Sequence, residues 1–229
     1  MDTDLLIVED LLLLLLDDTT GTIAGEGTLY YTLGGAVLVE LALRGAVQPD
    51  ESRTLFNGIR IRIRAVEGEA PSDPLLREAY EKVARKPRGV QELLIDIGSS
   101  LRGEVLDRLV ERGFIRREKG RLLGIFPTTR MPAQRPEYEA RLLESVRAAL
   151  VDGVEPETRT AAITALLSAS GTLPQMHPGI PWSGAVYTRG KELEKGSWGA
   201  GAVATAIAMT TAAIAASAVA VSTATTSNS

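Results

Sequence analysis

The chain of 229 residues contains no cysteine and only one histidine, His177. The absence of cysteine excludes disulfides, thiolate metal ligands and cysteine nucleophiles, and it predicts a reducing, cytoplasmic location. A single loop histidine leaves no histidine-based zinc site and no conventional Ser-His-Asp relay. Phosphate-loop and GxGxxG motifs are also missing from the sequence. We therefore expect a protein that is not an enzyme and has no metal ion or cofactor.

Long apolar runs are scarce as well. The longest run of one residue type, six leucines from Leu11, is flanked by acidic residues and is far shorter than the about 20 residues that a bilayer span needs. No basic segment precedes it, so a signal peptide is not expected. Residues 198–221 are uncharged and long enough to cross a bilayer, but their alanines and threonines are only weakly hydrophobic. We expect a buried small-residue helix there, with a membrane anchor as the alternative.

Positive charge is concentrated in the middle of the chain, although the formal net charge is only −4. Between Arg53 and Arg135 there are 18 Lys and Arg residues against 11 Asp and Glu residues. Both flanks are therefore acidic. Such segregation favours an oriented contact with a phosphate-bearing partner over general stickiness.

Isoleucine and arginine alternate strictly at the end of the segment 54–66. A period of two predicts a strand with the isoleucines on one face and Arg60, Arg62 and Arg64 on the other face. These three arginines form a positive stripe.

A short amphipathic helix followed by a basic hairpin is expected between Leu101 and Arg130. The apolar stripe of the helix ends before Gly113. The next segment, FIRREKGRLLGIF, predicts two strands that fold back around Lys119-Gly120. The tip of this hairpin carries Leu122, Leu123, Ile125 and Phe126. An apolar tip flanked by arginines suits a lipid surface, because insertion removes apolar area from water beside anionic headgroups.

Helices are expected over most of the remaining chain. The leucine-rich start predicts a buried first helix that ends at the Asp-Asp-Thr-Thr-Gly turn. Gly45 closes a second helix. Asp73 and Pro74 are a typical N-cap and first helical residue. Apolar residues at helical spacing predict two further helices over 136–152 and 157–170.

The fold class that follows is mainly α. We expect a single compact helical domain with one or two β-hairpins over residues 1–221, followed by a flexible polar tail at 222–229. Glu40 and Arg44 are four residues apart on the expected second helix, a spacing that is typical of an ion pair.

Three interpretations of the helix and hairpin remain open from the residues alone. In a peripheral membrane protein, the apolar tip enters the headgroup region. In a winged-helix nucleic-acid-binding module, Arg102, Arg108 and Arg112 face the major groove and residues 116–121 form a wing on phosphates. In an oligomeric interaction scaffold, the apolar hairpin is a contact between subunits.

Three segments of the chain resemble the Golgi phosphoprotein 3 family, in a bacterial form: LLIVEDLLLLLLDD, GAVLVELALRGAV and LVERGFIRREKGRLLGIFPTTR. The most specific parts are VELALRG at 39–45 and the block at 109–130, and order and spacing match over most of the chain. The resemblance implies a mainly helical domain that binds phosphatidylinositol 4-phosphate on the cytosolic face of a membrane and inserts an apolar hairpin. The basic N-terminal extension associated with coat-protein recruitment is absent, so that adaptor role is not expected.

The resemblance also assigns site residues. Arg102 occupies the position of one headgroup arginine, whereas Ser99 stands at a second arginine position, Gly34 at a third, and Gly25 near the pocket tryptophan. The strand arginines Arg60, Arg62 and Arg64 are candidates to supply replacement charge, and the apolar tip aligns with that of the family without a gap. The expected partner is an anionic phospholipid membrane. A homo-oligomer formed through the hairpin and a membrane-protein client are alternatives, and nucleic acid is not expected.

Overall fold

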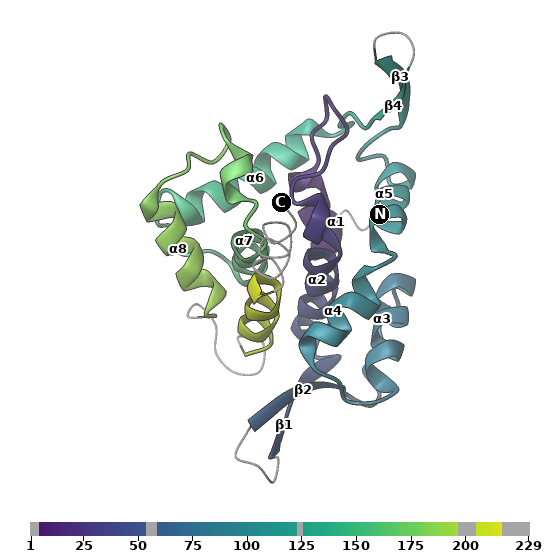
Figure 1. Cartoon of the computed structure of the whole chain (residues 1–229), viewed down its shortest axis with the longest axis vertical. Coiled ribbons are helices and arrows are strands. Elements are labelled where there is room, and N and C mark those ends of the chain that lie inside the picture. The colour runs from purple at the N-terminus through teal and green to yellow at the C-terminus, as the bar shows by residue number, and fades with distance from the viewer. Residues whose placement is uncertain (1–4, 54–58, 123–125, 197–204, 217–229) are drawn as a thin grey trace, which may run out of the picture.

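The computed structural model describes residues 5–53, 59–122, 126–196 and 205–216, with the backbone alone for the described parts of 51–61 and 120–128. The chain is mainly α-helical with two small antiparallel hairpins, as the sequence predicts (Figure 1). The elements are α1 (Ile7–Leu15), η1 (Glu26–Thr28), α2 (Leu29–Leu43), β1 (Val47–Arg53), β2 (Ile59–Ala65), α3 (Pro74–Ala84), α4 (Val90–Gly98), α5 (Leu101–Glu111), β3 (Glu118–Leu122), β4 (Phe126–Arg130), α6 (Pro136–Leu150), α7 (Thr158–Ala169), η2 (Leu173–Met176), α8 (Gly184–Glu194) and a helix over 205–216.

Local chemistry sets several helix ends where the sequence predicts them. The Asp73 carboxylate accepts hydrogen bonds from the backbone N–H groups of Leu75 and Leu76 at 3.0 and 3.3 Å, and Pro74 is the first residue of α3. Gly45 follows α2 with φ +72°, a conformation that glycine adopts without the penalty of a Cβ. The N–H of Ala46 then donates to Leu41 O at 2.9 Å and closes the helix.

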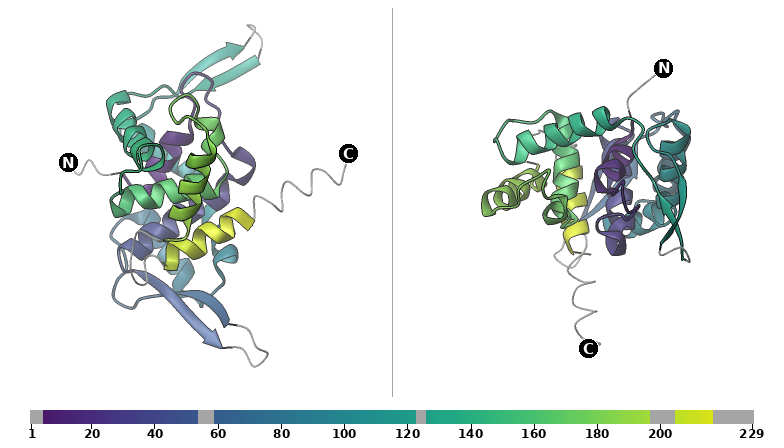
Figure 2. Two further views of the ribbon diagram at one scale, coloured as in Figure 1. Left: turned by 90° about the vertical axis from the view of Figure 1, so that its left-hand side faces the viewer. Right: turned by 90° about the horizontal axis from the view of Figure 1, so that it is seen from above.

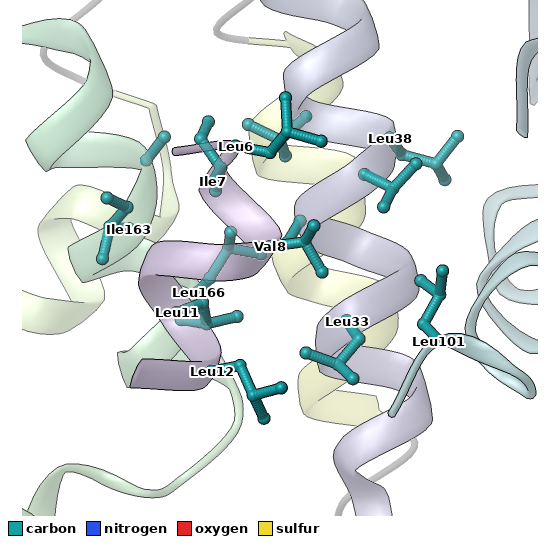
Figure 3. Close-up of a cluster of buried hydrophobic side chains, with 14 of the residues drawn as sticks. Leu6, Ile7, Val8, Leu11, Leu12, Leu33, Leu38, Leu101, Ile163 and Leu166 are labelled. Carbon is teal, nitrogen blue, oxygen red and sulfur yellow. The ribbon is translucent and has the colours of Figure 1, made fainter. Parts of the chain in front are cut away.

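The core is built around α1 and α2, which lie between two groups of helices (Figure 1). On one side are α6, α7, α8 and the helix 205–216, and on the other side are α3, α4 and α5. The buried leucines of α1 explain its position, since Leu11 and Leu12 are completely inaccessible to solvent. Figure 3 shows side chains of α1 directed toward Leu33 of α2 and Leu166 of α7. The prediction of a buried first helix is confirmed.

Glycines allow α2 and α4 to cross closely. A Cβ on Gly98 would lie 1.8 Å from Tyr30 O, and a Cβ on Gly34 would lie 2.4 Å from Leu94 O. Gly34 lies inside α2 although glycine is a weak helix former, and its missing side chain lets α4 come into contact with α2. The sequence did not predict that α2 begins as early as Leu29.

The hairpins β1–β2 and β3–β4 leave the helical body at opposite ends of its long axis (Figure 1). Both strand pairs lean toward the same side of the body, the side on which the helix 205–216 ends (Figure 2). The predicted turn at Lys119-Gly120 is wrong, since Lys119 pairs with Thr129 and Gly120 pairs with Thr128 inside the ladder. The turn instead falls between Leu122 and Phe126.

The C-terminal part contains two helices where the sequence suggested one at most. The helix α8 was not predicted, whereas residues 205–216 form a small-residue helix that buries Ile207 and Ile214. Thr211 Oγ1 donates to Glu194 O at 2.9 Å and joins this helix to the end of α8. The rest of the segment 198–221 lies outside the described residues. Within the described residues, no helix has both the length and the hydropathy that a bilayer span requires.

Candidate functional site

The β3–β4 hairpin places the backbone of Leu122 and Phe126, two of the predicted apolar residues, at the end farthest from the helical body. Leu122 and Phe126 are register partners in the last rung of the ladder before the turn. Leu123 and Ile125 fall in the segment 123–125, which is outside the described residues. The ladder runs back from that rung to the pair Glu118 and Arg130 at its base. The structure thus places two of the four predicted tip residues, Leu122 and Phe126, at the end of the ribbon away from its base.

Exposed cations surround the base of this hairpin. Arg116 pairs with Glu118 at 2.6 Å, and Arg117 pairs with Asp107 at 2.5 Å. These side chains are about half exposed, so water screens both pairs and the pairs hold the cations only weakly. Lys119 and Arg130 are also exposed. Positive charge is therefore available at the base of the ribbon, four register pairs from the rung of Leu122 and Phe126.

Several contacts fix the direction in which the hairpin leaves the body. The Gln134 N–H donates to Phe114 O at 2.7 Å, and the Arg116 N–H donates to Pro132 O at 3.1 Å. The loop before η1 also touches β4, since a Cβ on Gly21 would lie 2.4 Å from Thr129 O. The base of the hairpin is consequently held by its own strands and by a segment about one hundred residues earlier in the chain.

A buried carboxylate anchors α5, the helix that leads into the hairpin. Glu9 in the first turn of α1 is completely buried, and it accepts from Arg108 Nε at 3.1 Å and Arg112 Nη1 at 2.9 Å. Arg108 also donates to Asp73 Oδ2 at 2.8 Å. Burial opposes the charged form of Arg108, but its hydrogen bonds and the negative charges of Asp73 and Glu9 outweigh burial and raise the pKa of Arg108. Arg108 therefore stays charged, and both arginines are attached to the core through Glu9.

This anchoring argues against the winged-helix interpretation. A recognition helix needs its arginines on base edges or phosphates. Here the side chains of Arg108 and Arg112 are only 20% and 27% exposed and are directed to a carboxylate inside the protein. They also line an open pocket of about 460 Å³, whose third arginine, Arg44, pairs with Glu40 at 2.8 Å. The pocket therefore offers little uncompensated positive charge to a phosphate.

A second buried carboxylate joins α1 to the other group of helices. Asp10 is 1% exposed and accepts from Tyr138 at 2.8 Å and from Arg159 at 2.6 Å. Burial raises the pKa of Asp10, against the opposing effects of Arg159 and Tyr138. Arg159 also lies 3.5 Å from Glu40, whose predicted pairing with Arg44 is confirmed. Sequence reasoning missed Glu9 and Asp10 as anchors, because their partners are 99 to 149 residues away along the chain.

The strand arginines lie on the other hairpin. The alternation is confirmed at the described positions, since Arg62 and Arg64 are exposed while Ile63 between them is 3% exposed. Arg60 is placed by its backbone, opposite Ser52 in the register. These positions are at the opposite end of the long axis from the β3–β4 hairpin (Figure 1).

Arg102 is separate from both groups. It pairs with Glu26 at 2.7 Å beside the start of α2, with both side chains about half exposed. The strand arginines follow the other end of α2, a helix of 15 residues that spans about 22 Å. The structure therefore does not bring the four predicted headgroup arginines into one site.

Comparison with protein-family models matches residues 7–210 to Golgi phosphoprotein 3 (GPP34). The chain belongs to the Golgi phosphoprotein 3 family. The match includes α1, both hairpins and the first part of the helix 205–216, so the resemblance seen in the sequence extends over almost the whole described fold. The Golgi phosphoprotein 3 family is not a family of enzymes. Among the described residues of this member, no group of three His, Cys, Asp or Glu side chains is arranged to hold a metal ion.

Proposed function

We propose that this member of the Golgi phosphoprotein 3 family is a peripheral protein that binds anionic phospholipid bilayers from the cytosolic side. The β3–β4 hairpin makes the contact, with Leu122, Leu123, Ile125 and Phe126 entering the headgroup region. One observation carries the proposal: the ribbon projects from the body with exposed cations at its base, and its far end is the point where the sequence places four large apolar residues at 122, 123, 125 and 126. Family membership is consistent with this use of the hairpin.

Apolar and electrostatic contributions are both needed in this contact. Full burial of a Leu, Ile or Phe side chain contributes about 1.5–3 kcal/mol, and partial insertion of four such residues contributes about 4–6 kcal/mol. Each cation near an anionic leaflet adds about 1 kcal/mol, less where a surface ion pair already occupies it. Binding of this kind is reversible and depends on salt and on lipid charge.

We further propose that the protein responds to lipid charge and not to one headgroup such as phosphatidylinositol 4-phosphate. The family position for one headgroup arginine is Gly34, and its Cα faces the backbone of α4 so closely that no side chain fits. Ser99 and Gly25 occupy two further pocket positions, and Glu26 already pairs with Arg102. Direct headgroup contacts then come from exposed cations, among them those at the base of the hairpin.

Co-sedimentation with liposomes tests the proposal. Wild-type protein should sediment with vesicles that contain phosphatidylglycerol and not with pure phosphatidylcholine. A Leu122→Asp, Leu123→Asp variant should bind at least about 10-fold more weakly, since two inserted side chains become charged. The matched control is Val151→Asp, Val154→Asp, which makes the same change at two exposed apolar residues beyond α6. Equal absence of binding by wild type and by the tip variant contradicts the proposal.

Two further measurements separate the alternatives. Vesicles that contain phosphatidylinositol 4-phosphate should bind no better than phosphatidylglycerol vesicles of equal charge, and a 10-fold preference would contradict recognition by charge. If the hairpin is instead an oligomer contact, light scattering should show a smaller mass for the tip variant, with no effect of lipid. A membrane-protein client is compatible with either result, because it adds a partner without removing the lipid contact.

A further inference from the structure

The β1–β2 hairpin is a second ribbon that projects from the helical body, outside the proposed lipid contact of β3–β4. It projects from the opposite end of the long axis, yet it leans toward the same side of the body as β3–β4 in the left view of Figure 2. A flat surface laid against that side faces both ribbons and the end of the helix 205–216 (Figure 2). The helix α6 lies on the other side of the body, where the N-terminus emerges (Figure 2).

This second ribbon is firmly braced against α3 and the segment after it. Ile63 is buried, and its N–H donates to Arg88 O at 2.9 Å. Tyr80 of α3 donates its hydroxyl to Val66 O, just beyond β2, at 2.8 Å. The base of β2 therefore has a defined orientation, and the strand presents Arg62 and Arg64 to solvent on the face away from Ile63.

Two exposed arginines of this ribbon, Arg62 and Arg64, differ from the cations at the base of the other hairpin. Among the described side chains, neither Arg62 nor Arg64 forms a salt bridge, in contrast to Arg116 and Arg117 at the base of the other hairpin. Asp50 is the register partner of Arg62, but no ion pair joins them. Alternate residues on a strand are about 6.6 Å apart, so the stripe offers regularly spaced cations to a surface that carries many phosphates.

We propose that the β1–β2 hairpin is a second attachment point on the same anionic bilayer, made by the arginine stripe. This inference rests on the proposed function of the β3–β4 hairpin. The two hairpins have different roles: β3–β4 inserts apolar side chains, and β1–β2 binds lipid phosphates electrostatically. Attachment at both ends lays the long axis of the molecule along the membrane, and the second contact is strengthened because the first one holds it near the surface.

An anionic bilayer fits the stripe better than single-stranded nucleic acid does. Sequence-independent binding of single strands relies on aromatic side chains that stack with bases, in addition to cations. The strands Val47–Arg53 and Ile59–Ala65 contain no aromatic residue, and the sequence between them has one aromatic residue, Phe56, which is too few to stack with successive bases. Their chemistry suits phosphate contact alone.

The first experiment compares two variants that lose the same charge. Arg62→Ala, Arg64→Ala should bind phosphatidylglycerol vesicles roughly 30-fold more weakly than wild type, and its affinity should depend less steeply on salt. The control Arg141→Ala, Arg147→Ala removes two arginines of α6 and should bind as wild type does. Thermal unfolding of both variants checks that they fold. An unchanged affinity of the Arg62→Ala, Arg64→Ala variant for vesicles overturns the second attachment point. If the Leu122→Asp, Leu123→Asp variant still loses binding in that case, the proposed function of the β3–β4 hairpin holds.

The second experiment places a probe at each side of the body, which the absence of cysteine makes straightforward. A bimane label at Asp50→Cys on β1 should become brighter when vesicles are added, and a quencher carried by the lipids should dim it. The same label at Ser145→Cys, an exposed residue of α6, should show neither effect. The two-point orientation is contradicted if the label at position 145 responds to the vesicles. It is also contradicted if the label at position 50 does not respond while the protein is bound to them. Stripe-dependent binding of single-stranded RNA without any effect on vesicles would also overturn the proposal.

Discussion

Replacement of Glu9 by glutamine tests the buried anchor that joins α1 to α5. The substitution keeps the shape of the side chain and removes its negative charge. Three donors converge on the carboxylate: Leu6 N–H at 2.7 Å, Arg108 Nε at 3.1 Å and Arg112 Nη1 at 2.9 Å. A glutamine offers only one oxygen, and its NH2 group must then face at least one of these donors. The variant therefore loses hydrogen bonds as well as charge.

The expected loss of stability is about 2–3 kcal/mol. Removal of one partner from a fully buried ion pair costs about 3–5 kcal/mol. Here the cost is at or below the lower end, because the two arginines are 20% and 27% exposed and Arg108 retains its 2.8 Å contact with Asp73. For a chain of this length, about 2–3 kcal/mol corresponds to a decrease of roughly 5–10 °C in Tm.

Urea denaturation followed by circular dichroism measures the difference. The control is Glu26→Gln, which makes the same chemical change in the exposed pair with Arg102, where a loss below about 0.5 kcal/mol is expected. Equal effects of the two substitutions, or a loss below about 1 kcal/mol for Glu9→Gln, would show that burial of the carboxylate does not make it an anchor.

Two further predictions concern packing and pH. Gly98→Ala should destabilise the fold by about 3 kcal/mol, because the added Cβ would lie 1.8 Å from Tyr30 O. The control Gly103→Ala, on the open face of α5, should stabilise the fold by about 0.5–1 kcal/mol. Equal denaturation midpoints for the two variants would contradict the close crossing of α2 and α4. Burial and the nearby charge of Asp18 raise the pKa of Glu139 to about 7. A raised carboxyl pKa gives stability that is complete below the unfolded value of 4.5 and is lost as the pH rises through 7. Glu139→Gln should consequently match wild type near pH 4.5 and be more stable by about 2 kcal/mol at pH 8, and a gap that does not change with pH would contradict this.

Local patterns in the sequence were sufficient for several individual elements. The Asp73-Pro74 pair predicted the start of α3, because a carboxylate cap and a fixed proline φ act within one helical turn. The alternation around Ile63 predicted β2, because the side-chain period of a strand is a local property. The β3–β4 hairpin was also predicted, although its turn was misplaced by several residues. Its register depends on which strand residues pair, and pattern alone left that open.

By itself, then, the sequence determined the mainly helical fold class and most of its helices, but not α8 or the early start of α2, and it determined where basic and apolar residues concentrate and the family to which the chain belongs. Only the tertiary structure decided which of these features meet. It packed Gly35 against Ile214 of the helix 205–216, attached Arg108 and Arg112 to Glu9, and placed Arg62 and Arg64 far from the β3–β4 hairpin but on a ribbon that leans the same way. The physical reason is that such contacts join residues up to about 180 positions apart. They depend on how whole helices pack and which side chains they bury, and no short window of sequence contains that information.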